Sequence, residues 1–385
     1  MKNKIALISY HNEYNYGTML QAYALYRALQ MRGVDSEYIS YQISIPSLKQ
    51  RLFQGLIRYL SHPEKLYTKF AVRKENNQND FSFFKTEDFK TTIDAFNQWY
   101  KEYIPHTHIV YTEKNIQTIS DVYAKYIVGS DQVWSPYRNR RIAFFDYFFL
   151  NFVLNSSKKY SYAPSFGTTD LSSNYLDCIK KALNSFNKIS CREVALARKL
   201  SELTQKEIVP VIDPTLLLDR TEWKKVCKPV FGMPSEYILC YILGEKKTIS
   251  QFAEKLSKEK KIPVYYILTR PYYLEKQNCL TGVGPGEFLS LIMNASFVCT
   301  DSFHGTIFSI NFNVPFYSFT KRESTDSIND NDRIQLVLKE FGLENRFKHD
   351  TDMYSNDVFI CADEILSTRR LQSGYFLQSI IDETF

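Results

Sequence analysis

The segment 300–306, Thr-Asp-Ser-Phe-His-Gly-Thr, gathers more chemically active side chains than any other part of the chain. It follows the apolar stretch ASFVC and precedes a predicted helix at 304–313. His304 is one of six histidines among 385 residues. A histidine at a strand-to-helix turn suits proton transfer, and a helix start offers free N–H groups to an anion. We therefore predict that His304 is catalytic and that Ser302, Gly305 and Thr306 bind substrate. A structural histidine is the alternative.

A second candidate is the segment 128–134, Val-Gly-Ser-Asp-Gln-Val-Trp, where an apolar run gives way to polar residues. The carboxylate of Asp131 could serve as general base on a sugar hydroxyl, with Ser130 as a further substrate contact. Trp134 could form an aromatic wall for a sugar to stack on. The alternative is that Asp131 caps a helix and Trp134 belongs to the core.

Two further strand ends carry polar residues. Arg192, in the stretch SCRE, is a natural fork for a carboxylate or phosphate, although it could instead form a surface ion pair with Glu193. Asn15, Tyr16 and Gly17 follow the first predicted strand, where a helix start could bind an anion or a sugar hydroxyl. A tight turn in which Gly17 only permits the backbone angle is the alternative.

These motifs lie at the ends of strands in two series of alternating strands and helices. The first series has predicted strands at 4–10, 36–41, 122–128, 159–162, 188–191 and 208–212, and a helix at 18–32. The second has strands at 237–243, 263–268, 297–300 and 315–319, and helices at 246–260, 286–295 and 304–313. We predict an α/β protein with two Rossmann-like domains facing across a cleft. The first is residues 1–212, with a helical, basic excursion at about 45–120, and the second is residues 213–385. The seam is expected at Asp213-Pro214 and Pro229–Pro234.

Composition limits the possible partners and the compartment. The seven cysteines are scattered singly, which is typical of buried thiols and favours a reducing, cytoplasmic location. The N-terminus lacks the pattern of a signal peptide. His106 and His108 have no third ligand nearby, so we predict no metal site. The net charge of +6 is modest and no dense Lys/Arg run is present, so we predict no nucleic-acid partner.

The stretch 45–75 carries the densest positive charge in the chain. Between Leu48 and Lys74 the only acid is Glu64, and an apolar stripe has Arg51 and Arg58 near its edge. Such a helix could touch anionic lipid at the inner face of the membrane. Alternatively, it packs its stripe on the first domain and leaves its charges in solvent.

Together, seven stretches resemble the polysaccharide pyruvyl transferase family, in family order and over about 330 of the 385 residues. They are YHNEYNYGTMLQAYAL (10–25), VGSDQVW (128–134), YAPSFG (162–167), SCREVALARKL (190–200), IDPTLLLDRTEW (212–223), GPGEFLSLIMNASFVCTDSFHGTIFS (284–309) and NDRIQLVLKEFGL (331–343). The resemblance implies a fold like that of B-type glycosyltransferases. It also implies transfer of the enolpyruvyl group of phosphoenolpyruvate to two hydroxyls of a surface-polysaccharide sugar, giving a pyruvate ketal. Phosphoenolpyruvate would be the donor substrate, with no further cofactor, and a sugar or lipid-linked oligosaccharide the acceptor.

The resemblance also assigns residues. It implies that an arginine in the region of Arg192 and the histidine at His304 contact phosphoenolpyruvate. Several members carry arginine two residues before this histidine, where this chain has Ser302. Either Arg333, Arg270 or Arg322 supplies the missing cation, or the donor differs. The alternatives are a nucleotide-sugar glycosyltransferase of the same architecture and a non-catalytic glycan-binding relative.

Overall fold

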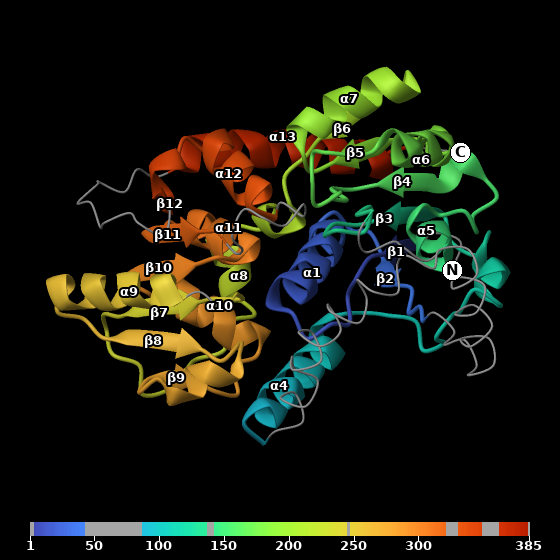
Figure 1. The fold of residues 1–385 in the computed structure, drawn as a ribbon. Coiled ribbons are helices and arrows are strands. Elements are labelled where there is room, and N and C mark those ends of the chain that lie inside the picture. Colours follow the sequence, from blue (N-terminus) through green and yellow to red (C-terminus); the bar gives the residue numbers. More distant parts are fainter. Residues whose placement is uncertain are drawn as a thin grey trace, which may run out of the picture.

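The computed structural model describes residues 4–42, 87–136, 142–244, 247–320, 330–348 and 362–383. The basic stretch 45–75 with its predicted apolar stripe, and Arg322, lie outside these residues. The described chain forms two α/β halves that lie side by side, each built on a parallel sheet (Figure 1). None of the described helices is both long enough and apolar enough to cross a membrane.

The first half is a parallel sheet of strand order β2-β1-β3-β4, and an isolated parallel bridge between Tyr160 and Lys188 connects it to the pair β5-β6. The strands are β1 (Ile5–Ile8), β2 (Ser36–Tyr38), β3 (Lys125–Val128), β4 (Lys159–Ser161), β5 (Ile189–Cys191) and β6 (Ile208–Pro210). The helices of this half are α1 (Tyr16–Gln30), α4 (Glu87–Tyr103), α5 (Ile142–Phe148), α6 (Ser173–Asn184) and α7 (Val194–Thr204).

The second half has one sheet of order β12-β11-β10-β7-β8-β9, with every pair parallel. Its strands are β7 (Ile238–Tyr241), β8 (Val264–Ile267), β9 (Cys279–Leu280), β10 (Phe297–Thr300), β11 (Phe316–Phe319) and β12 (Phe347–Lys348). The helices that follow β6 in the chain are α8 (Arg220–Lys224), α9 (Lys247–Lys260), α10 (Pro285–Met293), α11 (Phe303–Asn311), α12 (Asp330–Glu340) and α13 (Asp363–Ile381).

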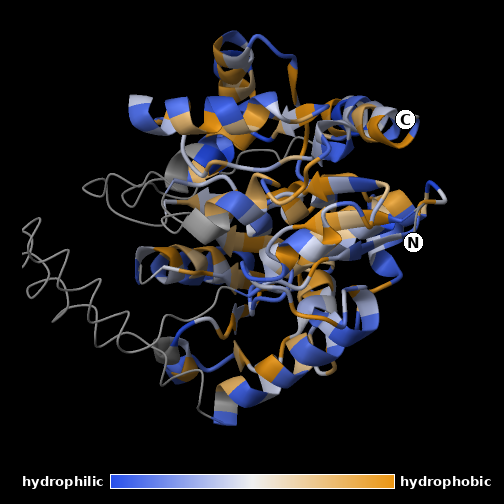
Figure 2. Cartoon of the chain, turned by 90° about the vertical axis from the view of Figure 1, so that its right-hand side faces the viewer, coloured by the Kyte–Doolittle hydropathy of each residue, from blue (hydrophilic) through white to orange (hydrophobic). Residues whose placement is uncertain are grey.

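The strands read as short apolar runs because helices cover both faces of each sheet. All four residues of β1, IALI, and all four of β7, ILCY, are buried. In Figure 2 the strands are mostly hydrophobic, whereas α4 alternates hydrophobic and hydrophilic residues along its length. One core cluster contains buried residues of both halves, including Leu7 from β1 and Leu239 from β7. The two halves therefore share part of their core.

Helix α4 lies within the predicted excursion and bridges the two halves. It runs from Glu87 to Tyr103 and is part of the helical structure expected for that excursion. Phe96 of α4 packs on Tyr16 of α1, with ring centroids 4.8 Å apart. On the other side, the Thr92 hydroxyl accepts a hydrogen bond of 3.1 Å from the Gly282 N–H, next to α10. The helix thus contacts both domains.

The last helix, α13, returns to the first half. Lys125 is the first residue of β3, which pairs with β1. Its ammonium group donates hydrogen bonds to the carbonyls of Ile380, Ile381 and Glu383 at 2.6, 2.8 and 2.8 Å. The sequence-based division assigned α13 to the second domain, because its pattern alone gives no sign of the sheet on which it packs. In space, the end of the chain contacts the first domain (Figure 1).

Lys125→Met should lower the free energy of unfolding by about 2–3 kcal/mol. The ammonium is buried and satisfies three helix-end carbonyls, and charged hydrogen bonds of this kind contribute more than neutral ones. Urea unfolding measures the change. Lys180→Met, at an exposed position of α6, is the matched control and should change stability by less than about 0.5 kcal/mol. Equal effects of the two substitutions would contradict the anchoring role of Lys125.

Candidate functional site

The sequence candidates meet where the carboxyl ends of the two sheets face each other. In the first sheet the strand order reverses between β1 and β3, and in the second between β7 and β10. Ligands of open α/β sheets bind at such switch points. Gly17 lies in the first turn of α1 after β1, Asp131 in the loop after β3 and His304 in the first turn of α11 after β10, and all three are buried. The arrangement thus joins the two switch points in one cluster.

The first turn of α1 contacts the second domain directly. A Cβ on Gly17 would lie 1.9 Å from Nδ1 of His304, so only glycine lets the imidazole pack here. Tyr16 donates a hydrogen bond of 2.8 Å to the Val283 carbonyl and stacks on Phe288, with ring centroids 4.4 Å apart. The side chain of Asn15 caps α1 by accepting from the Thr18 N–H at 3.1 Å. Gly17 therefore does more than permit a turn, because its lack of a side chain makes room for the His304 ring. Tyr16 and Asn15 already make contacts within the protein.

Helix α11 holds His304 through its own first turn. The Ser302 hydroxyl caps the helix by accepting from the Gly305 N–H at 3.4 Å. A Cβ on Gly305 would lie 2.5 Å from the Thr300 hydroxyl, so the helix start packs tightly on the end of β10. The Thr306 hydroxyl bonds to the Ser302 carbonyl at 3.0 Å and to the Ser318 hydroxyl at 2.7 Å. Ser302, Gly305 and Thr306 therefore fix the position of the imidazole.

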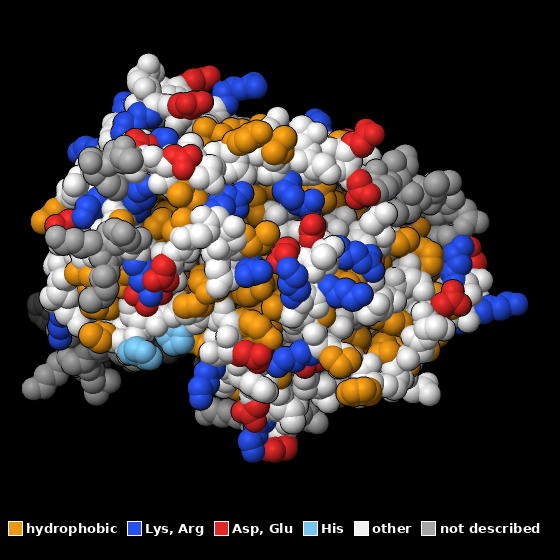
Figure 3. Space-filling model, turned by 180° about the vertical axis from the view of Figure 1, so that it is seen from behind, with side chains coloured by type: hydrophobic (Ala, Val, Ile, Leu, Met, Phe, Trp, Pro, Cys, Tyr) orange, Lys and Arg blue, Asp and Glu red, His pale blue; other side chains and the backbone are white. Residues whose placement is uncertain are grey.

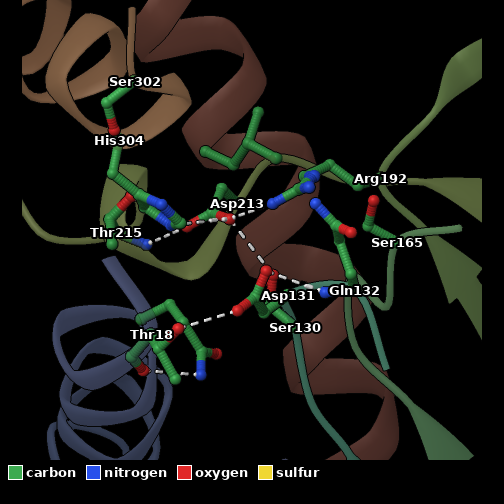
Figure 4. Close-up of polar contacts among 12 residues, drawn as sticks. Thr18, Ser130, Asp131, Gln132, Ser165, Arg192, Asp213, Thr215, Ser302 and His304 are labelled. Atoms are coloured by element: carbon green, nitrogen blue, oxygen red, sulfur yellow. Dashed lines mark hydrogen bonds and ion pairs between the residues drawn. The ribbon is translucent and has the colours of Figure 1, made fainter. Parts of the chain in front are cut away.

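Asp213 lies at the centre of the cluster, between Arg192 and His304 (Figure 4). Its Oδ2 accepts from Nη1 of Arg192 at 2.7 Å and from the Ser130 hydroxyl at 3.1 Å, and it lies 3.8 Å from Nε2 of His304. Its Oδ1 accepts from the Thr215 N–H and hydroxyl at 3.0 and 2.8 Å. Burial opposes the charge of Asp213, but His304, Arg192 and Thr215 together hold its pKa below the usual range.

Asp131 connects α1 to the loop after β3. It has the left-handed backbone conformation, with a φ of 64°, which is uncommon for a residue with a side chain. Its Oδ2 accepts from the Thr18 hydroxyl at 2.9 Å and its Oδ1 from the Gln132 N–H at 2.8 Å. Both carboxylate oxygens thus take part in bonds within the protein.

Two guanidinium groups flank one aromatic ring beside His304. Arg192 lies 4.3 Å and Arg333 lies 5.6 Å from the centroid of Phe303. With the Gln132 amide oriented so that its oxygen faces Arg333, that oxygen accepts from both terminal nitrogens at 2.7 and 2.9 Å. Helix α12 of the second domain thereby contacts the loop after β3 of the first. Arg270, by contrast, donates to the Leu243 carbonyl at 3.1 Å.

Among the buried side-chain nitrogens of this cluster, Nη2 of Arg192 and Nε2 of His304 make no hydrogen bond within the described residues. Burial lowers the pKa of His304, and the positive charges of Arg192 and Arg333 add to this effect against the opposing charges of Asp213 and Asp131. An unsatisfied buried donor costs about 1–3 kcal/mol, so such groups are typical of sites that bind a ligand. Both donors would suit an anion.

The structure differs from three of the sequence-based interpretations. Trp134 is 0 % exposed, donates to the Phe148 carbonyl at 3.0 Å and stacks on Phe149, so it belongs to the core and offers no face to a sugar. Arg192 is buried and pairs with Asp213, so it forms no surface pair with Glu193. Asp213, interpreted only as a domain seam, lies at the centre of the site.

Sequence reasoning missed several other polar side chains of the site. Each one follows a strand or opens a helix at the same sheet edges, so the rule that found His304 would also have found them. They are Thr18, Gln132, Ser165, Glu193, Asp213 and Thr215.

On the back face of the molecule, basic, acidic and hydrophobic side chains are interspersed (Figure 3). Among the residues that the structure describes, no group of three or more His, Cys, Asp or Glu side chains could hold a metal ion. His106 is engaged by the Ile104 carbonyl at 2.7 Å.

Comparison with known proteins gives a family match. The family model described as polysaccharide pyruvyl transferase matches residues 15–320. No curated protein matches the sequence.

Several solved structures of low sequence identity are similar to this chain. A putative UDP-N-acetylglucosamine 2-epimerase from Listeria monocytogenes is similar with a TM-score of 0.50 and 10% identity, over 100% of this chain and 99% of that one. The UDP-GlcNAc 2-epimerase from Methanocaldococcus jannaschii has a TM-score of 0.49 at 12% identity, over 100% and 94% of the two chains. The UGT89C1 of Arabidopsis thaliana has a TM-score of 0.44 at 8% identity, over 99% and 95%. The Listeria likeness and the two parallel sheets confirm the expected fold of two Rossmann-like domains.

Gly17→Ala should destabilise the protein by about 1–3 kcal/mol, because the new methyl group would overlap the His304 ring. Helix propensity alone predicts that Gly17→Ala stabilises the protein, since alanine is favoured over glycine inside a helix by about 1 kcal/mol. Chemical denaturation decides between the two. The control is Gly374→Ala in α13, whose Cβ would meet only the flexible end of Arg32, at 3.1 Å, and which should leave stability unchanged or raised. A stabilised Gly17→Ala protein would contradict the close packing of the two domains at His304.

Proposed function

The chain belongs to the polysaccharide pyruvyl transferase family, and we propose that it transfers the pyruvyl group of phosphoenolpyruvate to two hydroxyls of a sugar, forming a pyruvate ketal on a surface-polysaccharide precursor. The observation that carries the proposal is the pair of buried, unpartnered donors of Arg192 and His304. They face each other across Asp213, between the two domains. A small polyanion is the ligand that such donors favour.

The two arginines on Phe303 match the two anionic groups of phosphoenolpyruvate. Its carboxylate and phosphate each need a cation, and both guanidinium groups lie within 6 Å of one ring. We assign Arg192 to the donor because its Nη2 is unpartnered. Arg333 approaches from α12 and would supply the cation that Ser302 does not. Ser302 instead caps α11, whose first N–H groups add a favourable dipole.

His304 is the candidate acid for the methylene carbon of phosphoenolpyruvate. Without donor, burial keeps the pKa of His304 low, so the ring is neutral at neutral pH. The negative charges of a bound donor favour the imidazolium form, because opposite charges within about 4–6 Å stabilise each other. Binding of phosphoenolpyruvate would thus favour protonation of His304, and this proton is the one that the reaction uses.

The acceptor and the place of reaction are also part of the proposal. We propose a lipid-linked sugar as acceptor and action in the cytoplasm at the inner face of the membrane. The basic stretch 45–75 supports this through its sequence alone. A nucleotide-sugar glycosyltransferase would share the fold, but none of the contacts at the cluster favours a sugar nucleotide over a smaller anion.

The direct test is incubation of the purified protein with phosphoenolpyruvate and lipid-linked sugars, followed by mass spectrometry of the acceptor. We expect the mass gain of a pyruvate ketal together with release of phosphate. Release of a nucleoside diphosphate from a sugar nucleotide, without any product from phosphoenolpyruvate, would support the glycosyltransferase instead. Binding of sugars with no turnover of either donor would support a glycan-binding protein.

Arg192→Lys should raise the KM for phosphoenolpyruvate by about tenfold and change the acceptor KM little. An ammonium cannot make the two-point contact of a guanidinium, and it also loses the stacking on Phe303. Steady-state titration of each substrate measures the effect. Arg198→Lys, at an exposed position of the neighbouring helix α7, is the control. An unchanged donor KM with an altered acceptor KM would assign Arg192 to the acceptor.

The affinity for phosphoenolpyruvate should fall as pH rises, by at most about tenfold per pH unit for one linked proton. The reason is that the pKa of His304 is low in the free protein and rises when the anionic donor binds, so binding takes up a proton. Calorimetry between about pH 7 and 8.5 avoids the second ionisation of a phosphate monoester, near 6. His304→Gln should bind with little pH dependence. Identical pH profiles for both proteins would contradict proton uptake by His304.

A further inference from the structure

Glu193 is a buried carboxylate that neighbours Arg192 in the chain. Its residue is 6 % exposed, and its side chain has no ion pair among the described residues. Oε1 accepts a short hydrogen bond from the Ser165 hydroxyl, while Oε2 has no hydrogen-bond partner within the described structure. A buried carboxylate oxygen without a donor is unfavourable, so a group that donates a hydrogen bond is expected to bind there.

The local fold does not use this carboxylate to cap its own helix. Glu193 occupies the N-cap position of α7, yet its side chain makes no capping bond to that helix. The helix start still favours its negative charge through the backbone dipole. The Ser165 hydroxyl is itself held by the Gly167 N–H at 3.0 Å, so it presents its proton to Oε1 in one direction. The pair is therefore oriented before any ligand arrives.

The loop after β4 joins this carboxylate to the central cluster. The Ser165 N–H donates to the Asp131 carbonyl at 2.8 Å, and the Arg192 N–H donates to the Pro164 carbonyl at 3.2 Å. A Cβ on Gly167 would lie 2.9 Å from the Gln132 side-chain amide, so this loop packs closely against Gln132. The same amide contacts Arg333. Figure 4 shows Ser165 beside Gln132 and Arg192, on the side of the cluster away from His304. Glu193 and His304 thus belong to opposite sides of the donor-binding arginine.

The other buried carboxylates of the site are already committed. Both oxygens of Asp131 accept hydrogen bonds, from Thr18 and Gln132, and both oxygens of Asp213 accept as well. Asp301 accepts from the backbone N–H groups of Leu243 and Gly244 at 2.7 Å each. Only the Oε2 of Glu193 combines burial with the lack of a donor among the described carboxylates of the cluster.

We propose that Glu193, rather than Asp131, is the base that accepts the proton of the attacking acceptor hydroxyl. This assignment rests on the proposed pyruvyl transfer. His304 gives its proton to C3 of phosphoenolpyruvate, and the hydroxyl oxygen forms a bond to C2 while its proton passes to Oε2 of Glu193. The C2–O bond to phosphate then breaks with its electron pair going to the phosphate, which takes the proton from Glu193. The second hydroxyl bonds to C2 and gives its proton to His304. Both residues return to their starting states, so the cycle balances.

The test compares Glu193→Gln with the matched control Glu202→Gln, at an exposed position of the same helix. Glutamine keeps an oxygen that can accept from Ser165 but cannot take a proton. We expect kcat for ketal formation to fall about 10²–10⁴-fold in Glu193→Gln and to stay unchanged in Glu202→Gln. The dissociation constant for phosphoenolpyruvate should stay within about threefold of wild type, since the donor contacts are intact.

The possible outcomes separate the two claims. An active wild type with a Glu193→Gln protein that keeps more than about a tenth of kcat overturns the role of Glu193 and leaves pyruvyl transfer standing. The same holds if Asp131→Asn, but not Glu193→Gln, loses turnover while still binding the donor. A wild type that forms no ketal from phosphoenolpyruvate overturns the proposed function, and the role of Glu193 in it.

Discussion

The Asp213 carboxylate, paired with the Arg192 guanidinium at the end of the first sheet, also contacts His304 of the second domain. Both side chains are buried, and a buried charge is tolerated only when it is paired and hydrogen-bonded. Asp213 therefore accepts four hydrogen bonds, from residues that follow β3, β5 and β6. It also lies close to His304, which follows β10. Removing one partner of such a pair commonly costs about 3–5 kcal/mol because the other charge stays buried. The pairing leaves Nη2 of Arg192 and Nε2 of His304 for a ligand.

The rest of the fold supports this arrangement. The missing side chain at Gly17 lets α1 approach His304, and α4 and α13 each connect parts of the chain that are far apart in sequence. With both domains held in this way, the unpartnered nitrogen atoms Nη2 of Arg192 and Nε2 of His304 are buried between them. In the proposed reaction, phosphoenolpyruvate bound at these atoms would contact residues of both domains. Such contacts would tie donor binding to the relative position of the domains and would exclude water from the reacting atoms.

The sequence predicted most strands because fully buried parallel strands are short apolar runs bounded by polar turns. Phe297–Thr300 was expected with the bounds that β10 has, and His304 was expected from its position just after that strand. Contacts between side chains that are far apart in the sequence were harder to predict. The central role of Asp213 depends on Arg192, His304 and Ser130 approaching it from elsewhere in the chain, and no local pattern records this. Trp134 looked like a binding residue because burial and ligand contact both favour an aromatic side chain after a strand. The return of α13 to Lys125 likewise depends on tertiary contact.

The most direct test of this account is a crystal structure of the protein with phosphoenolpyruvate bound. We predict that the phosphate and carboxylate of the donor lie against Arg192 and Arg333, that Nε2 of His304 points at the donor, and that Nη2 of Arg192 becomes hydrogen-bonded. Phosphoenolpyruvate bound away from this cluster, with Arg192 and His304 still unpartnered at these atoms, would contradict the central claim.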